Sequence, residues 1–174
     1  MEYQEDQENI FLFFDAVTLD SAADAISWII GRNSVEEKPD FITMIINSQG
    51  GDITAGFAVI DFMKNSEIPI HTVGTGQILS CGLMIFMAGS KGNRSLTKNT
   101  SVLSHVFSGN SEGSFHNIKA MGKEFDYAYE RLVNFYLDAT SLSKEEIEST
   151  LLTMNDVFLT PEDALKYGLC DKII

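Results

Sequence analysis

The chain has 174 residues, 44% hydrophobic and 21% charged, a composition typical of globular proteins and unlike that of disordered or fibrous ones. Its formal net charge of −13 at pH 7 disfavours binding to nucleic acid or to an anionic membrane surface, because both would repel it. The two cysteines, Cys81 and Cys170, are too few for a disulfide framework, so we expect reduced thiols and a cytoplasmic protein. The length, with no repeat or linker, predicts a single domain over residues 1–174.

The first half of the chain alternates short apolar runs with amphipathic segments. Short apolar runs predict strands at residues 10–14, 41–47 and 68–74, and the last two have the pattern of buried strands. Apolar residues recur at helical spacing after Thr18 or Asp20, and again over residues 54–64. This half is therefore predicted to contain a βαβ unit, with the third strand ending at Gly74 to Gly76.

The second half continues the alternation of helices and strands. Helices are predicted from about Ser80, over 115–139, after the capping box of Ser143 and Glu146, and from Thr160-Pro161 to Gly168. Strands are predicted at 101–106 and 169–174. Strands that alternate with helices and are buried on both faces indicate an α/β fold with a largely parallel sheet.

Ser80 lies in TGQILSCGLMIFMAGS, residues 75–90, immediately before a run of large apolar residues. One interpretation is that its hydroxyl caps a buried helix. The other is that it is an acyl-transfer nucleophile at a helix N-terminus, where amide groups and the helix dipole favour negative charge. The stretch itself leaves both open.

A nucleophilic serine needs an imidazole base, and that base needs a carboxylate to fix its tautomer. His105 ends a predicted strand, where functional groups gather in parallel sheets, although backbone carbonyls could equally satisfy it. His71, in mid-strand, and His116, at a helix start, are interpreted as structural or surface residues.

Gly50 and Gly51 allow the backbone to turn its amide groups toward a ligand, as an oxyanion hole requires, although a simple turn needs the same residues. The segment around Ser80 is not the G-x-S-x-G elbow of α/β-hydrolases. The cysteines fit no zinc spacing, and the sequence indicates no cofactor.

Four separated motifs resemble the proteolytic subunit of the Clp protease family in the same order. They are INSQGGDITAGFAVIDFM, GTGQILSCGLMIFMAGSKGNR, SVLSHV and NDVFLTPEDALKYGLCDKII. The resemblance runs from about Ile10 to the C-terminus. It implies the ClpP/crotonase spiral of repeated ββα units, with the helix at 115–139 as a protruding handle.

The resemblance assigns roles to individual residues. Ser80 matches the nucleophile, His105 the general base and Asp156 the acid of the triad, with Asp171 as a second candidate for the acid. The amides of Gly51 and Cys81 match the oxyanion donors, and Cys81 is disfavoured as nucleophile because its side chain points elsewhere.

The family forms heptameric rings that stack in pairs as a tetradecamer, so the resemblance implies self-association around an inner chamber. The expected activity is that of the ATP-independent peptidase core of a self-compartmentalising serine protease. A non-catalytic or auxiliary subunit of a mixed ring is an alternative, as is a crotonase-like acyl-CoA enzyme.

Relatives also present an apolar pocket to an AAA+ unfoldase, and most of that pocket is polar in this chain. The matching positions are Thr43, Ile45, Asn65, Val73, Thr75, Ser95 and Thr97. An apolar docking loop buries little apolar area in such a pocket. We therefore expect weak docking to a typical AAA+ unfoldase. The subunit would then use an unfoldase with different loops, work without one on peptides, or join mixed rings in which other ClpP subunits dock the partner.

Overall fold

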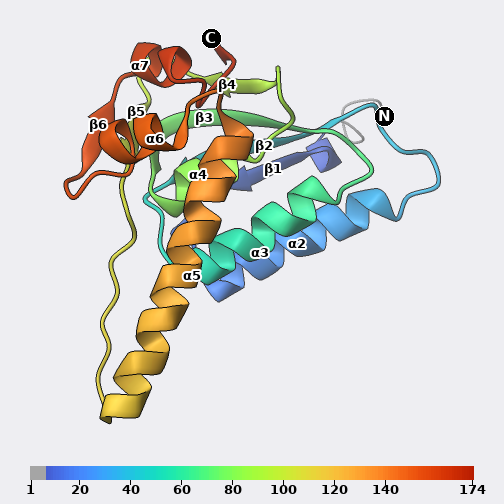
Figure 1. The fold of residues 1–174 in the computed structure, drawn as a ribbon. Coiled ribbons are helices and arrows are strands. Elements are labelled where there is room, and N and C mark those ends of the chain that lie inside the picture. The colour runs from blue at the N-terminus through green and yellow to red at the C-terminus, as the bar shows by residue number, and fades with distance from the viewer. Residues whose placement is uncertain (1–6) are drawn as a thin grey trace.

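The computed structural model describes residues 7–174 and has a mixed α/β architecture (Figure 1). Parallel neighbours in its main sheet are, in order, β1 (Ile10–Phe13), β2 (Ile42–Ser48), β3 (Ile70–Leu79), β4 (Arg94–Leu96) and β7 (Lys172–Ile173). The strand β5 (Ser101–Ser104) pairs in parallel with the end of β3 and antiparallel with β6 (Val157–Leu159). The predicted α/β fold with a largely parallel sheet is confirmed.

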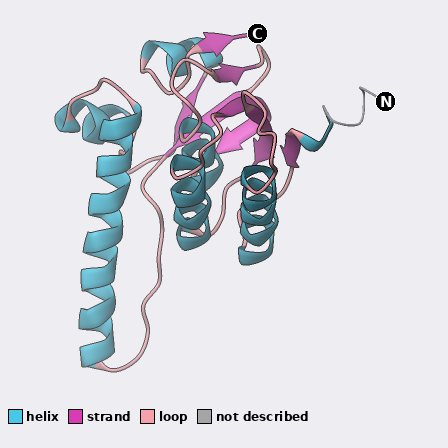
Figure 2. Cartoon of the chain, turned by 90° about the vertical axis from the view of Figure 1, so that its right-hand side faces the viewer, coloured by secondary structure: helices cyan, strands magenta, loops and turns pink. Residues whose placement is uncertain are grey.

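The described helices are α2 (Leu19–Asn33), α3 (Ile53–Lys64), α4 (Cys81–Met87), α5 (Phe115–Ala139), α6 (Lys144–Thr150) and α7 (Pro161–Lys166). Figures 1 and 2 both show α2 and α3 side by side along one face of the sheet. The capping boxes that begin α2, α6 and α7 at Thr18, Ser143 and Thr160 all form. The helix α4 is buried throughout, as its uniformly apolar sequence predicts.

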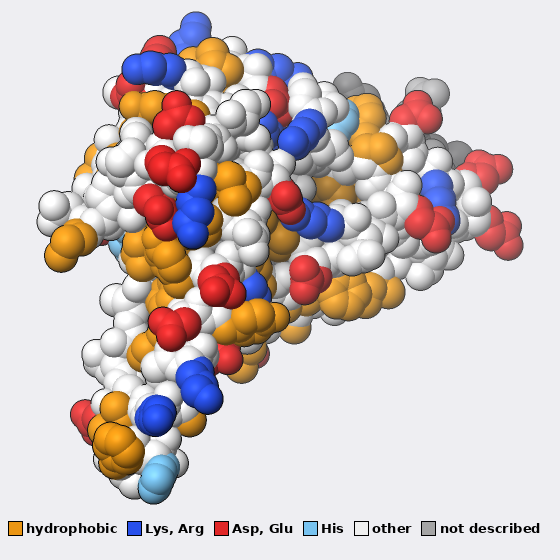
Figure 3. Space-filling view, in the orientation of Figure 1, with side chains coloured by type: hydrophobic (Ala, Val, Ile, Leu, Met, Phe, Trp, Pro, Cys, Tyr) orange, Lys and Arg blue, Asp and Glu red, His pale blue; other side chains and the backbone are white. Residues whose placement is uncertain are grey.

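The helix α5 projects from the body of the molecule as a handle, and the segment before it runs alongside (Figures 1 and 2). Its bounds match the prediction, because Ser114 caps the first turn by accepting a hydrogen bond from the amide of Asn117. Its C-terminal half packs into the core, whereas the side chains of Phe115, Ile118 and Met121 near its free end are exposed. Figure 3 shows apolar side chains gathered at that end.

The prediction that the third strand ends at Gly74 to Gly76 was wrong. β3 continues to Leu79 because its last three residues pair with β5, and Gly76 bends the chain at a φ of 65° that favours glycine. The side-chain oxygen of Asn47 accepts a hydrogen bond from the amide of Gln77 and bridges the resulting irregularity between β2 and β3.

The short strands β4 and β6 were not predicted, because three residues carry no readable period. The predicted strands at 101–106 and 169–174 are shorter in the structure, ending at Ser104 and beginning at Lys172. Residues 1–6, part of the acidic start of the chain, lie outside the described residues. No helix within residues 7–174 combines the length and apolar character that crossing a bilayer requires.

Candidate active site

Ser80 occupies the turn between β3 and α4 and has an unusual backbone conformation. Its φ of 55° makes it the one non-glycine residue of positive φ within residues 7–174. Its amide donates to the carbonyl of Leu103, which fixes the turn against β5. The hydroxyl makes no capping hydrogen bond to α4, so the interpretation of Ser80 as a side-chain cap was wrong.

The Ser80 hydroxyl instead belongs to a chain of three side chains. Its Oγ lies 2.7 Å from Nε2 of His105, and Nδ1 of His105 lies 2.9 Å from Oδ1 of Asp156. When Nδ1 carries the ring proton and donates it to Asp156, Nε2 is free to accept from the hydroxyl. The structure thus brings together three residues that are 25 and 51 positions apart in the sequence.

Asp171, the second candidate for the acid, lies elsewhere and binds Arg94. Its carboxylate accepts hydrogen bonds from the backbone amide, Nε and Nη2 of Arg94, whose side chain is 4% exposed. Burial acts to raise the pKa of Asp171, but the hydrogen bonds and charge of Arg94 outweigh it and hold that pKa below its usual value. Arg94 also donates to the carbonyls of Ala139 and Gly168, so this pair joins the ends of α5 and α7 to the sheet.

Gly51 and Cys81 line one cavity together with Ser80. The amide of Val17 donates to the carbonyl of Gly50, and the amide of Asp52 donates to the carbonyl of Val17. The amide of Gly51 takes part in neither hydrogen bond. Cys81 is the first residue of α4, and the first amides of a helix have no acceptor within it. Both amides are therefore suited to bind an anion.

Glycine is required at the Gly51 position for two reasons. Its φ is 152°, and a Cβ there would overlap the backbone oxygen of Val17. The neighbouring Gly50, with a φ of 86°, has its missing Cβ position 2.6 Å from the carbonyl oxygen of Leu79. The paired glycines thus allow the turn to approach Ser80 closely.

The thiol of Cys81 is not exposed to the cavity as a nucleophile. It is 3% exposed and lies 3.4 Å from the carbonyl oxygen of Gly51, to which it donates. Burial raises the pKa of the thiol to about 11, so it is protonated at neutral pH.

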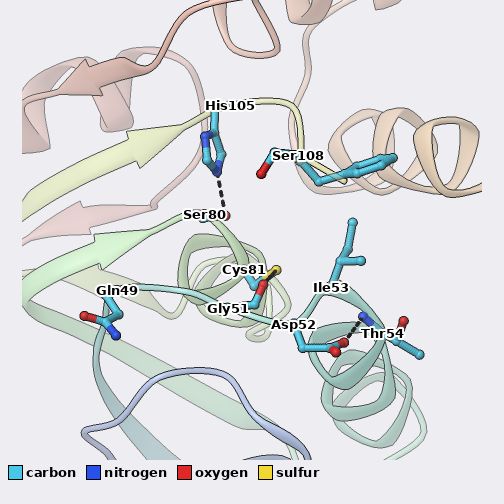
Figure 4. Close-up of a pocket in the computed structure, with 10 residues that line it drawn as sticks. Gln49, Gly51, Asp52, Ile53, Thr54, Ser80, Cys81, His105 and Ser108 are labelled. Atoms are coloured by element: carbon cyan, nitrogen blue, oxygen red, sulfur yellow. Dashed lines mark hydrogen bonds between the residues drawn. The ribbon is translucent and has the colours of Figure 1, made fainter. Parts of the chain in front are cut away.

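These groups surround a cavity of about 450 Å³ (Figure 4). Ile53 and Phe107 supply apolar surface, and Asp52 places a carboxylate at its edge. Asp52 and Phe107 were not singled out from the sequence. The place of Asp52 directly after Gly51 could have indicated that it borders the site.

The other two histidines lie outside this cavity. The ring of His71 stacks on Phe41 with 4.2 Å between centroids, and His116 is exposed at the start of α5. Burial lowers the pKa of His71, and the charge of Lys172 lowers it further. Across residues 7–174, no three His, Cys, Asp or Glu side chains gather in a way that could hold a metal ion.

The comparison with known families decides the classification. The model of the family described as Clp protease matches residues 4–174. The chain belongs to the Clp protease family. The resemblance seen in the four motifs is confirmed, and the α/β fold with its projecting helix agrees with it.

Members of the Clp protease family from several bacteria align with most of the chain. The ATP-dependent Clp protease proteolytic subunit of Deinococcus radiodurans is 35% identical over 133 residues, covering 76% of this chain and 64% of that protein. The ATP-dependent Clp protease proteolytic subunit 2 of Synechococcus sp. (strain CC9605) is 30% identical over 168 residues, covering 97% of this chain and 84% of that protein. That of Parasynechococcus marenigrum is 31% identical with the same coverage. This chain therefore spans just under two thirds of the D. radiodurans subunit.

Proposed function

We propose that this Clp protease family member is a serine endopeptidase in which Ser80 attacks the peptide carbonyl and His105 is the general base. Asp156 orients the imidazole and stabilises its charged form. The observation that carries the proposal is the unbroken sequence of hydrogen bonds from Asp156 through His105 to Ser80, at 2.9 and 2.7 Å. The cavity beside Ser80 gives a peptide access to it.

The reaction follows from this geometry. Ser80 Oγ bonds to the carbonyl carbon while His105 Nε2 takes the hydroxyl proton, and the carbonyl oxygen becomes an anion bound by the amides of Gly51 and Cys81. The C–N bond then breaks, and His105 returns the proton to the leaving amine. Water, deprotonated by His105 Nε2, attacks the resulting ester. The C–O bond to Ser80 then breaks, His105 returns the proton to Ser80 Oγ, and the carboxylic acid leaves.

Hydrolysis of a fluorogenic peptide by the wild type, Ser80→Ala and His105→Ala tests the proposal. Each variant should lose at least about 10³-fold in kcat, because nucleophile and base act as one unit. His71→Ala is the matched control, because His71 lies outside the cavity. Equal rates for the wild type and Ser80→Ala would reject catalysis at this site and leave the auxiliary-subunit alternative.

We propose that the peptidase works as heptameric rings stacked in pairs, so that the catalytic groups face an enclosed chamber. The exposed apolar side chains at the free end of α5 support this, because such a surface suits contact with a second copy. Mass photometry should find fourteen times 19.3 kDa, and seven times that mass would mean that the rings are not stacked in pairs. A monomer at micromolar concentration would contradict the assembly.

We propose that the subunit docks a typical AAA+ unfoldase weakly and degrades unfolded proteins or peptides without ATP, or in mixed rings. Thr43 and Ile45 of β2, Val73 of β3 and Ser95 of β4 align across the sheet, and this face mixes polar with aliphatic side chains. The free thiols Cys81 and Cys170 support a reducing compartment such as the cytoplasm. Submicromolar binding of a Clp unfoldase to the subunit without other subunits would contradict weak docking.

A further inference from the structure

Asp52 is held in a defined position next to the site where peptide cleavage is proposed. It directly follows Gly51 and is the N-cap of α3, where its Oδ1 accepts hydrogen bonds from the amides of Thr54 and Ala55 at 2.7 and 2.9 Å. Figure 4 shows its side chain between Gly51 and Thr54, turned to the backbone of Thr54 at the edge of the cavity. The cap fixes one carboxylate oxygen, and the residue as a whole is exposed.

No positively charged side chain among the described cavity residues balances the negative charge of Asp52. Among the ten described residues that line the cavity, Asp52 is the single carboxylate, and none is lysine or arginine. Burial is the main cause that raises the pKa of the neighbouring Cys81 thiol, and the charge of Asp52 raises it further. A substrate side chain entering the cavity therefore experiences a negative potential.

The proposed reaction identifies the substrate residue that would meet this carboxylate. The attacked carbonyl must place its carbon at Ser80 Oγ and its oxygen between the amides of Gly51 and Cys81. The substrate residue that provides this carbonyl is thus held at Gly51, the residue directly before Asp52 in the enzyme. In the proposed complex, its side chain enters a cavity with apolar surface from Ile53 and Phe107 and a carboxylate at its edge, which matches the aliphatic stem and terminal charge of lysine or arginine.

Building on the proposed function, we infer that Asp52 is a specificity-determining residue that favours cleavage after lysine or arginine and disfavours cleavage after glutamate. Asp52 takes no part in the proton transfers. Its effect comes from attraction or repulsion of the substrate side chain, so it changes the ranking of peptides. Because the carboxylate is exposed, the attraction falls as salt is added.

The test compares three fluorogenic peptides that differ only in the residue before the cleaved bond, lysine, leucine or glutamate, using the assembled wild-type protein and Asp52→Asn. Asparagine keeps an oxygen that can accept the capping hydrogen bonds, so the helix start is retained while the charge is removed. Each attractive or repulsive charge contact at an exposed site changes kcat/KM by about two- to fivefold. The ratio of kcat/KM for lysine over glutamate should therefore fall by about five- to twentyfold in Asp52→Asn.

Asp61→Asn is the matched control, because Asp61 is exposed on the same helix and lines a separate groove. It changes the net charge equally and should leave the ratio unchanged. The inference is supported if the ratio falls in Asp52→Asn alone and falls in the wild type as salt rises. It is overturned if a fluorophosphonate labels Ser80 but the ratio is equal in all three proteins, or if Asp61→Asn changes it as much. Absence of both labelling and hydrolysis in the wild type would instead reject the proposed function, and the inference with it.

Discussion

Ser104 of β5 lies opposite Val157 of β6 in an antiparallel pair. In such a pair, the residue after Ser104 faces the residue before Val157, so His105 and Asp156 are placed across from each other. Ser104 is itself held in the core by hydrogen bonds to the hydroxyl of Tyr136 and the carbonyl of Leu151, at 2.8 and 2.7 Å. The strand pairing thus carries the orientation of the proposed catalytic base.

Replacing Asp156 with asparagine should lower kcat for peptide hydrolysis by about 10²-fold and change KM little. The amide cannot stabilise the charged imidazole that forms in the transition state, and the effect stays at the low end because the Asp156 side chain is 59% exposed. Steady-state kinetics measure this. Asp171→Asn is the comparison, and a larger loss of kcat per folded molecule in Asp171→Asn would mean that the acid has been assigned to the wrong residue.

Asp171→Asn should instead destabilise the fold, by about 3 kcal/mol in the free energy of unfolding. It leaves the buried guanidinium of Arg94 without its charge partner, and breaking such a pair is strongly unfavourable. Urea denaturation followed by circular dichroism measures the change. A loss below about 0.5 kcal/mol is the effect of an ordinary surface substitution, and it would show that the pair does not stabilise the fold.

The same pair predicts a pH dependence. The pKa of Asp171 is lower in the folded protein than in the unfolded chain, so its stabilising effect is complete above the unfolded pKa of about 4. This stabilisation is lost as the pH falls through the lower, folded pKa. The difference in unfolding free energy between the wild type and Asp171→Asn should therefore be constant from pH 5 to 7 and shrink below about pH 4. A difference that grows on acidification would have the wrong sign.

Gly51→Ala should abolish peptidase activity or prevent folding, because the new Cβ overlaps the backbone oxygen of Val17 at a φ that disfavours other residues. Gly31→Ala is the matched control within helix α2, where a Cβ meets nothing within 4 Å. It should raise stability by about 0.5–1 kcal/mol. Thermal unfolding and peptide hydrolysis measure both variants, and near-normal activity of Gly51→Ala would contradict the described turn.

Iodoacetamide should alkylate Cys81 in the native protein very slowly at pH 7.5. The thiol is buried, and its pKa of about 11 leaves almost no thiolate at that pH. Intact mass measured over time should show modification only as the pH approaches 11 or after denaturation. Rapid alkylation of Cys81 at neutral pH, with loss of activity in parallel, would make the thiol a serious candidate for the nucleophile.

Periodicity and capping signals in the sequence identified the longer elements well. The amphipathic helices and the 115–139 segment each had many residues of consistent spacing, and Ser143 with Glu146 marked a helix start that the structure contains. The short strand β6 and the extension of β3 to Leu79 could not be predicted in this way. Both depend on pairing with β5, a contact between distant segments that leaves no local pattern.

The candidate site was partly predictable for the same reason. The position of Ser80 between a strand and a buried helix left two interpretations, and the positive φ that turns its hydroxyl away from the helix depends on the tertiary structure. The choice between Asp156 and Asp171 required the resemblance to the family. Once β6 is known, the strand register alone brings Asp156 to His105, whereas Asp171 binds Arg94.

Reaction of the assembled protein with a fluorophosphonate, followed by mass spectrometry of its peptides, tests the proposed catalytic centre most directly. Such a reagent bonds to a serine whose proton is removed by a neighbouring base. We predict one phosphonyl adduct per chain, located on Ser80, formed slowly or not at all in His105→Ala, with peptidase activity lost in proportion to labelling. An unlabelled Ser80 in active protein, or an adduct on another residue that tracks the loss of activity, would contradict the account.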